Sequence, residues 1–490
     1  MGAASQWCES RHLTRSQRIE ANVTSRTSNR WSRTPEILVA LILVLAVGAW
    51  QFDLGRRLGI SGSDPAVTPK PATARGLQVP TPTLVAPAEP AAGPAGDPAK
   101  VRAAIGPLLH RKALGRSVGV EVVDLATGKV LTRSGPAAVT PASTMKLLTS
   151  VAALEVVGGQ TRFETTVTRR GHRLFLVGGG DPLLTERRAK GYPERASLAD
   201  LADQVASSLP LRHAYSLRFD ASLFSGPSVN PAWPPSYRTD GVVPPISALW
   251  DDEGRAAYGG FVADPAADAA ADFAAMLRKR GVRLKPAVRP AKSPAGAVEL
   301  AQVSSPPLAD IVGHLLAVSD NNAAEVVAHH VGLAQGTGGS FEGGVAGVRR
   351  ALRALEIPLA KSRILDGSGL SRQNRLAPET LSAVLRVAAS PEHPQLRVAV
   401  TGMPVAGYTG SLTWRFDRGA AAGRGRVQAK TGTLTGVHGL AGVVSDTQGS
   451  TFGFVMIADQ VPLAKQLTAR ILIDEAAAAL AACACGSGTP

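Results

Sequence analysis

Aromatic residues and cysteines are scarce in this chain of 490 residues. Phe, Trp and Tyr make up only 4% of it, so Ala, Val and Leu must fill any buried core. The three cysteines lie near the two ends, at Cys8, Cys483 and Cys485. A single residue between two cysteines fits no common zinc motif, and three cysteines provide no disulfide framework. We therefore expect a fold that needs no disulfide.

Acidic residues are outnumbered, with 38 Asp and Glu against 53 Lys and Arg, which gives a formal net charge of +15. This charge favours acidic surroundings such as nucleic acid, anionic lipid head groups or acidic wall polymers. The arginines are spread along the chain, and no basic patch alternates with aromatic residues, so we expect no nucleic-acid partner. A hydrophobic content of 44% with 19% charged residues is typical of a globular protein.

Long apolar runs are also rare, and one of them lies near the N-terminus. Residues 1–36 are polar and carry several arginines, and an uncharged apolar run follows within 37–52. This order predicts a cytoplasmic N-terminal segment and an exported remainder. The run is short for a membrane span, which needs about 20 residues. We interpret 37–52 as a single membrane anchor or uncleaved signal. Because Val47 and Ala49 offer a cleavage pattern, the alternative is secretion to the cell wall.

Composition divides the rest of the chain. Residues 53–98 are rich in Ala, Pro, Gly and Thr, a composition that forms an extended linker rather than a core. Beyond it we expect a catalytic domain in two parts, 99–158 and 303–482, with an inserted domain at 159–302 and a short tail at 483–490.

Ser143 and Lys146 lie three residues apart. On a helix this spacing places both side chains on one face, where the hydroxyl and the amine can meet. A serine hydroxyl becomes a good nucleophile when a neighbouring base takes its proton. A lysine can be that base only if its pKa is well below its ordinary value of about 10.4. By itself, the spacing is more typical of an ordinary helix start.

Two further motifs give this pair a chemical meaning. Ser319-Asp-Asn321 and Lys430-Thr-Gly-Thr433 follow in the order that penicillin-recognising serine enzymes use. We interpret the trio as an active site, in which the charge of Lys430 would hold Lys146 neutral.

Hydrophobic periodicity places these motifs on the elements of the catalytic part. Residues 144–157 are apolar nearly all round, which predicts a central buried helix that Ser143 precedes. The backbone N–H groups at a helix start favour developing negative charge. The patterns also predict strands at 117–124, 130–133, 427–430, 439–444 and 451–457 and helices over 304–318, from 322 onward and over 462–482.

The inserted domain follows from the 173 residues between Lys146 and Ser319, far more than a loop needs. Its pattern is mixed, with strands at 163–168, 174–177 and 215–220, a helix over 198–209, and a second helix with Asp264 as N-cap, Pro265 at its first position and Gly281 as its stop. The residues that follow the glycine turn 178–182 do not match a phosphate-binding loop, and we interpret the turn as structural.

At this point the sequence resembles the class C low-molecular-mass penicillin-binding proteins, the D-alanyl-D-alanine carboxypeptidase/endopeptidase family of serine peptidases. The resemblance covers roughly residues 100–480, and Ser411 stands where the family pattern has Thr. The motifs that carry it are Ser143-Thr-Met-Lys146, Ser319-Asp-Asn-Asn-Ala-Ala-Glu325, Asp366-Gly-Ser-Gly-Leu-Ser371, Gly407-Tyr-Thr-Gly-Ser-Leu412 and Lys430-Thr-Gly-Thr-Leu434.

The resemblance implies an α/β (α+β) fold of the penicillin-binding/β-lactamase-like serine transpeptidase type, a sheet covered by helices, with a large inserted mixed α/β domain. It also implies acylation of Ser143 by peptidoglycan stem peptides and by β-lactams. The N–H groups of Ser143 and Thr433 would form the oxyanion hole. The implied catalytic residues are Ser143, Lys146 and Ser319, and the implied substrate-binding residues are Asn321, Lys430, Thr431, Gly432 and Thr433.

Two other functions stay open from the sequence, a serine β-lactamase and a non-catalytic wall-binding scaffold. Glu356 follows Asn321 at a spacing close to that of a β-lactamase glutamate, but its surroundings lack that pattern, and we interpret it as structural. We expect no cofactor and no metal, since His329 and His330 are adjacent on a helix and cannot face one ion. We interpret His314, His438 and Asp320 as structural too.

Overall fold

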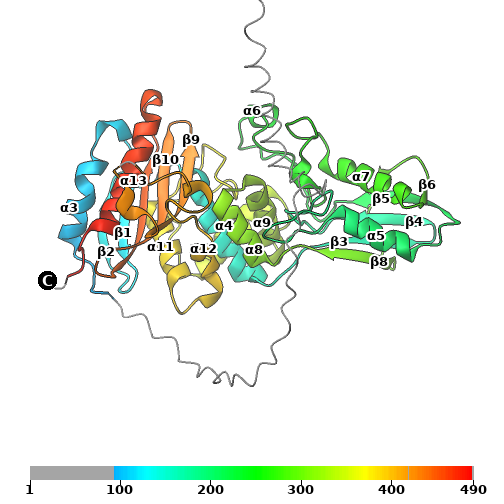
Figure 1. Cartoon of the computed structure of the whole chain (residues 1–490), viewed down its shortest axis with the longest axis horizontal. Helices are drawn as coiled ribbons and strands as arrows, with labels where there is room; N and C mark the ends of the chain where they lie inside the picture. Colours follow the sequence, from blue (N-terminus) through cyan, green and yellow to red (C-terminus); the bar gives the residue numbers. More distant parts are fainter. Residues whose placement is uncertain (1–92, 418, 488–490) are drawn as a thin grey trace, which may run out of the picture. The chain divides into compact units, whose positions relative to one another are not determined.

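The computed structural model describes residues 93–417 and 419–487 (Figure 1). The predicted cytoplasmic segment, the membrane anchor and most of the linker fall at 1–92, outside the described residues. Within the described ranges, no helix is both long and apolar enough to cross a membrane.

A five-stranded antiparallel sheet forms the centre of the catalytic part, in the order β2-β1-β11-β10-β9. The two N-terminal strands therefore join the three C-terminal ones, with β1 paired to β11. Through this pairing, the first and last strands of the catalytic part belong to one sheet, and the residues between them in sequence extend from it. The strands are β1 (Val118–Asp124), β2 (Val130–Ser134), β9 (Val427–Leu434), β10 (Val437–Ser445) and β11 (Thr451–Ala458).

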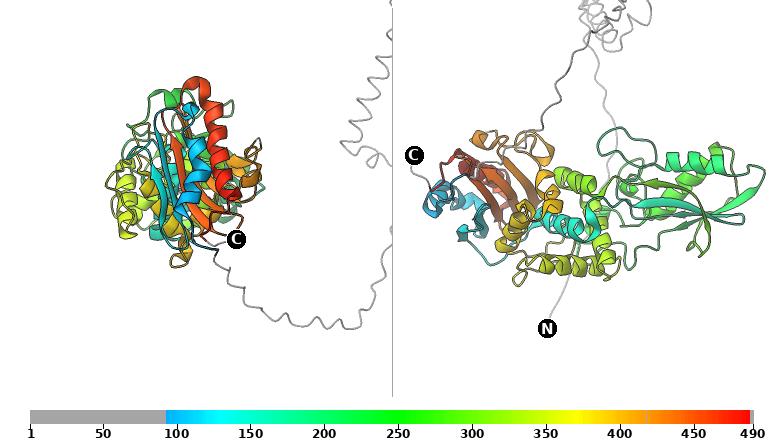
Figure 2. Two further views of the ribbon diagram at one scale, coloured as in Figure 1. Left: turned by 90° about the vertical axis from the view of Figure 1, so that its left-hand side faces the viewer. Right: turned by 90° about the horizontal axis from the view of Figure 1, so that it is seen from below.

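Helices cover both faces of this sheet (Figures 1 and 2). In β11, Val455 and Ile457 pack into one core, and Phe454 and Met456 pack into a second core on the opposite face, as the two-residue period of a strand requires. The second core contains α3 (Pro98–Leu109) and α13 (Gln466–Ala482). The first core contains α4 (Met145–Ala153), α8 (Leu308–Val318), α9 (Asn321–Ala334), α10 (Phe341–Ala354), α11 (Pro378–Ala389) and α12 (Val398–Thr401). The predicted sheet covered by helices is confirmed.

The buried helix predicted over 144–157 is present as three joined pieces. A 3-10 turn at Ala142–Thr144 precedes α4, and a π-helical turn at Leu154–Gly158 follows it. All nine residues of α4 are buried. The helix is therefore central, as its all-round apolar pattern predicted.

The helix predicted over 304–318 begins later than expected. Ser304 is the last residue of β8 (Val298–Ser304), and Oγ of Ser305 accepts a hydrogen bond from the backbone N–H of Phe163 at 2.9 Å. The serines thus belong to a strand end, and α8 starts at Leu308 without a side-chain cap. The helix starts later than predicted because strand pairing uses these residues.

The inserted residues form a second, mixed sheet in the order β6-β5-β4-β3-β8, with β7 also paired to β5. Helices α5 (Leu198–Ser208) and α7 (Pro265–Lys279) pack against it, and a short helix, α6 (Ser236–Thr239), lies between them in sequence. The strands besides β8 are β3 (Glu164–Arg170), β4 (Arg173–Val177), β5 (Ala214–Asp220), β6 (Arg283–Leu284) and β7 (Arg289–Pro290).

Helix α7 begins and ends as predicted. Oδ1 of Asp264 accepts a hydrogen bond from the N–H of Ala267 at 3.1 Å, and Pro265 occupies the first turn. Gly281 follows the last helical residues with φ of +84°, a conformation that glycine adopts without strain.

The glycine turn after β4 packs the inserted residues against α9. A Cβ on Gly179 would lie 1.9 Å from the carbonyl oxygen of Glu164, so no larger residue fits there. The carbonyl oxygen of Gly180 accepts a hydrogen bond from Nε2 of His330 at 2.9 Å, and Phe163 stacks on the same imidazole. The structural interpretation of this turn is confirmed.

The two ends of the described chain meet. Gly96 pairs with Gly486 in an isolated antiparallel bridge, and the N–H of Asp97 donates to the carbonyl oxygen of Cys485 at 2.7 Å. Cys483 and Cys485 form a disulfide, so the expectation of no disulfide is wrong. The chain turns directly after α13, which brings the two Cα atoms to 5.1 Å, within the range that a disulfide spans.

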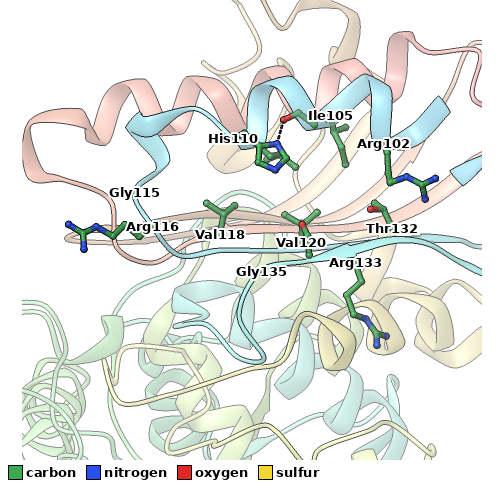
Figure 3. A pocket seen from close by; sticks show the side chains of 13 residues that line it. Arg102, Ile105, His110, Gly115, Arg116, Val118, Val120, Thr132, Arg133 and Gly135 are labelled. Atoms are coloured by element: carbon green, nitrogen blue, oxygen red, sulfur yellow. Dashed lines mark hydrogen bonds between the residues drawn. The ribbon is translucent and has the colours of Figure 1, made fainter. Parts of the chain in front are cut away.

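A groove of about 450 Å³ lies between α3 and the β1–β2 hairpin (Figure 3). Arg102, Arg116 and Arg133 line it together with apolar side chains such as Ile105 and Val120. None of the predicted site residues lines this groove.

Candidate active site

Two segments that are distant in sequence meet where the turn at Ala142–Thr144 lies against β9, an edge strand of the five-stranded sheet. A Cβ on Gly432 would lie 2.8 Å from the carbonyl oxygen of Pro141 and 3.1 Å from Cγ2 of Thr144. Glycine at this position therefore lets β9 lie directly against the turn that carries Ser143. The structure brings the Lys430–Thr433 segment and the start of α4 together in this way.

Lys146 connects the nucleophile candidate to the other motifs. Its Nζ lies 3.0 Å from Oγ of Ser143, 2.7 Å from Oδ1 of Asn321 and 2.8 Å from the carbonyl oxygen of Ser368. The Lys146 side chain is fully buried, whereas Ser143 is partly exposed. All three acceptors are uncharged, so none of them holds the proton as a carboxylate would. The site thus has a buried amine in contact with an accessible hydroxyl.

Burial lowers the pKa of Lys146 from its ordinary 10.5 to about 8. The carboxylates of Glu325, Asp320 and Asp366 oppose this shift, because negative charges favour the ammonium form. A pKa of about 8 leaves a useful fraction of free amine near neutral pH. Lys146 can therefore accept the proton of a neighbouring hydroxyl.

The expectation that Lys430 holds Lys146 neutral needs correction. Burial is the main cause of the lowered pKa of Lys146, and the mutual repulsion between the two lysines contributes to the lowered pKa of Lys430. Burial, followed by the charges of Lys146 and Arg415, lowers the pKa of Lys430 well below its ordinary value. Lys430 is completely buried, which a sequence motif does not reveal.

The hydroxyl of Thr431 lies beside Lys430 and contacts the hydroxyl of Ser411. Nζ of Lys430 donates to the carbonyl oxygen of Thr431 at 3.1 Å, and the Thr431 hydroxyl lies 3.0 Å from that of Ser411. Thr433 is exposed in the same strand and pairs with His438 of β10. An amine beside several hydroxyls is a suitable partner for a carboxylate. Ser411, which replaces the expected Thr, keeps a hydroxyl in this cluster.

The Ser319-Asp-Asn321 segment joins α8 to α9. Oδ1 of Asp320 accepts hydrogen bonds from the N–H groups of Asn322 and Ala323 at 2.9 and 3.0 Å, so Asp320 caps α9, which is a structural role. Ser319 has φ of +62°, and Ala142, directly before Ser143, has φ of +48°. Left-handed backbone is uncommon for these residue types and is often concentrated at functional sites.

The turn over residues 366–371 supplies a site contact that reasoning about side chains missed. The carbonyl oxygen of Ser368 accepts from Lys146, and the hydroxyl of Thr149 donates to the carbonyl oxygen of Gly367 at 2.7 Å. The motif was visible in the sequence as part of the family resemblance. A backbone carbonyl has no sequence signature, however, so its contact with the lysine could not be predicted.

Two buried carboxylates hold this turn. Glu325 accepts hydrogen bonds from the N–H groups of Gly367 and Ser368 at 3.1 and 2.8 Å. Asp366 accepts from the N–H groups of Gly369 and Ser371, at 2.9 and 2.6 Å. These contacts fix the Ser368 carbonyl that receives the lysine. The sequence signal for this role is Asp366 followed directly by Gly367.

The remaining candidates lie outside the catalytic contacts. His329 and His330 are buried in α9, and burial lowers the pKa of each to about 4. His314 on α8 lies 3.6 Å from the carboxylate of Asp320. Glu356 is exposed in the turn after α10, with φ of +56°. The site in this structure consists of serine, lysine, amide and threonine groups.

Comparison with known proteins identifies the family. The model of the D-Ala-D-Ala carboxypeptidase 3 (S13) family matches residues 101–259 and 256–480. The chain belongs to this family. It is a serine-type D-Ala-D-Ala carboxypeptidase, and the predicted family and class of enzyme are confirmed.

Individual relatives match over most of their length. Carboxypeptidase Rv3627c of Mycobacterium tuberculosis is 34% identical over 455 residues, which cover 88% of this chain and 94% of that protein. Carboxypeptidase DacB of Mycolicibacterium smegmatis is 34% identical over 478 residues, covering 94% and 99%. A D-alanyl-D-alanine carboxypeptidase of an Actinomadura species is 30% identical over 438 residues, covering 71% and 79%.

Solved structures have the same fold. The crystal structure of penicillin binding protein 4 from Haemophilus influenzae superposes with a TM-score of 0.64 at 21% sequence identity, covering 77% of this chain and 97% of that one. The predicted fold class is confirmed.

Proposed function

We propose that the enzyme acts on peptidoglycan stem peptides, as a carboxypeptidase and as a DD-endopeptidase, with Ser143 as the nucleophile. The observation that carries this proposal is the 3.0 Å contact between Nζ of Lys146 and Oγ of Ser143. It is a hydrogen bond between a hydroxyl and an amine whose pKa is about 8. The family establishes the carboxypeptidase activity, and the experiment below tests the endopeptidase activity and the nucleophile.

In the first step, Oγ of Ser143 attacks the carbonyl carbon of the penultimate D-alanine while its proton passes to Nζ of Lys146. The carbonyl oxygen becomes an oxyanion, which the N–H groups of Ser143 and Thr433 bind. Each such donor typically stabilises the transition state by about 3–4 kcal/mol. The start of α4 favours the same charge through its backbone dipoles.

In the second step, the bond from carbon to the peptide nitrogen breaks, and the hydroxyl of Ser319 relays the proton from Nζ of Lys146 to that nitrogen. Terminal D-alanine leaves as a free amino acid, and Ser143 carries the acyl group as an ester. A water molecule then attacks the ester, with Lys146 again taking the proton, and the shortened peptide leaves. The two N–H groups on Nδ2 of Asn321 can bind a carbonyl oxygen of the substrate in each step.

Lys430, Thr431 and Thr433 would bind the carboxylate of the terminal D-alanine. A negative charge next to Lys430 favours its ammonium form, since burial otherwise disfavours it. The same group would receive a β-lactam carboxylate, so a β-lactam should acylate Ser143. One solved structure of the Haemophilus influenzae protein is a complex with a β-lactam.

We propose further that residues 37–52 hold the enzyme on the membrane, with the catalytic part outside the cytoplasm. Support comes from the uncharged apolar run and from the basic residues before it. The linker at 53–98 would then separate the catalytic part from the bilayer.

The deciding experiment is incubation of the purified enzyme with a D-Ala-D-Ala muropeptide and, separately, with a cross-linked dimer. Mass spectrometry then follows products and acyl-enzyme. We expect loss of one D-alanine, cleavage of the cross-link and a covalent adduct on Ser143. Turnover of β-lactams without attack on the muropeptides would favour the β-lactamase, and no reaction with either would favour the scaffold.

A further inference from the structure

Three carboxylates gather in the inserted region, away from the Ser143 site. Asp268 and Asp272 are four residues apart on α7, so they share one face of the helix. Asp251 comes from the loop that follows Trp250. One oxygen atom from each of these three carboxylates lies within 4.8 Å of the others. Such close like charges repel one another unless something neutralises them.

Asp251 is the unusual member of this group. Its side chain is only 5% exposed, and Oδ2 has no hydrogen-bond partner. A buried carboxylate oxygen without a partner is costly and calls for a ligand or a proton. Burial, followed by the charges of Asp272 and Asp252, raises the pKa of Asp251 to about 7. No ion pair within the described residues neutralises any of the three carboxylates.

We propose that Asp251, Asp268 and Asp272 bind a hard divalent cation, Ca²⁺ or Mg²⁺. Both ions prefer oxygen ligands and commonly bind carboxylates together with water. Oxygens on opposite sides of a Ca²⁺ ion are about 4.8 Å apart, and those around Mg²⁺ are about 4.2 Å apart at most. Three oxygens within 4.8 Å can therefore share one ion. The exposed position of Asp268 leaves room for water as further ligands.

The cation would tie α7 to a loop that contacts the active-site segment. Two residues after Asp251, Oε2 of Glu253 accepts a hydrogen bond from Nδ2 of Asn322 at 2.7 Å. Asn322 is the neighbour of Asn321. Both Asp252 and Glu253 have positive φ, +44° and +59°, so the loop is held in an unfavourable backbone conformation. Bonds from a metal to Asp251 would stabilise that conformation.

The test uses the purified full-length chain, freed of metal with EDTA, and measures ion binding by calorimetry and thermal unfolding. Ca²⁺ and Mg²⁺ are tested in separate arms. We expect one ion per chain and a rise in Tm of about 2–5 °C at an ion concentration 100 times the Kd. Asp268→Asn and Asp272→Asn should each remove most of this rise. Glu299→Gln, which changes an exposed carboxylate on β8, is the matched control and should keep it.

The sign of the effect in each condition makes the test specific. In EDTA, Asp268→Asn and Asp272→Asn should be as stable as the wild type or more so, because each removes like-charge repulsion. In the presence of Ca²⁺ or Mg²⁺, the wild type should be more stable than either variant. Because Asp268 is exposed, its variant should fold even if Asp251→Asn does not. The proposal is overturned if neither ion raises the Tm, or if the two variants bind the ion as the wild type does.

Discussion

Oδ1 of Asn321 accepts a hydrogen bond from Nζ of Lys146 at 2.7 Å, a shorter contact than the 3.0 Å between the same Nζ and Oγ of Ser143. The amide thus fixes the lysine between the two segments, although 175 residues separate the partners. Burial lowers the pKa of Lys146 to about 8, and the uncharged Asn321 acceptor orients its amine.

Ser143→Ala should abolish covalent labelling by a fluorescent penicillin, because it removes the attacking oxygen. The fold should persist, since only one partly exposed hydroxyl is lost. Gel fluorescence and intact mass measure the labelling, and thermal unfolding checks the fold. Ser207→Ala, on the surface of α5, is the control and should label normally. Labelling of Ser143→Ala at the wild-type rate would exclude Ser143 as the nucleophile.

Asn321→Asp should move the acidic limb of the pH–rate profile of acylation, the range in which the rate rises with pH, to higher pH. Acylation requires neutral Lys146, whose pKa is about 8, so the wild-type rate should rise with pH up to that value. A carboxylate in contact with Nζ raises such a pKa by about 1–3 units, so acylation near pH 7 should fall about 10-fold or more. The control, Asn321→Ala, adds no charge, and its limb should stay near pH 8. A limb that overlays the wild type for Asn321→Asp would contradict this account.

Lys430→Gln should slow acylation by β-lactams that carry a carboxylate, without moving the acidic limb. The reason is that burial lowers the pKa of Lys146, whereas Lys430 is needed for the substrate carboxylate. Comparison of a carboxylate-bearing β-lactam with its neutral ester measures the effect, which should be small for the ester. A shift of the acidic limb of the pH–rate profile in either direction, relative to the wild type, would mean that this interpretation of Lys430 is incorrect.

His329→Gln should make the protein more tolerant of acid relative to the wild type. Burial lowers the pKa of His329 from 6.5 to about 4 in the folded state, so folding requires the neutral ring. Its stabilising effect is complete above pH 6.5 and is lost as the pH falls towards 4. The stability difference between wild type and variant should shrink by about 1.4 kcal/mol per pH unit in that window. Denaturant unfolding measures it, with exposed His172→Gln as the control.

The full-length chain should fractionate with membranes, and a variant that lacks residues 1–60 should be soluble. The apolar run at 37–52 is the reason for this expectation. Fractionation combined with N-terminal sequencing tests it. A soluble product that begins at Trp50 would show instead that the run is a cleaved signal.

The sequence predicted those features that depend on a side chain's own chemistry or on residues nearby in the chain. The order of the three motifs predicted that Ser143, Lys146 and Asn321 would meet. The all-round apolar pattern predicted the buried α4, and Asp264 with Gly281 predicted the ends of α7. Each of these depends on neighbouring residues or on chemistry that a side chain displays by itself.

Features that depend on tertiary structure could not be predicted. Whether Ser304 caps a helix or ends a strand is decided by its partner strand, and the contact of Ser368 with Lys146 is made by a backbone oxygen. The effect of Lys430 was misjudged because its burial was unknown. The cluster of Asp251 with Asp268 and Asp272 has no local sequence motif, because the loop that carries Asp251 meets α7 only in the tertiary structure.

The bridge between Gly96 and Gly486 places the entry and the exit of the catalytic part side by side. A pulling force transmitted along the chain through Gly93 would first load the hydrogen bonds of this bridge and the adjoining Asp97–Cys485 contact. Strands β1 and β11, which hold the sheet together, would be strained only after these contacts break. These contacts between the two ends would therefore protect the geometry around Ser143 if the chain were pulled from its N-terminal side.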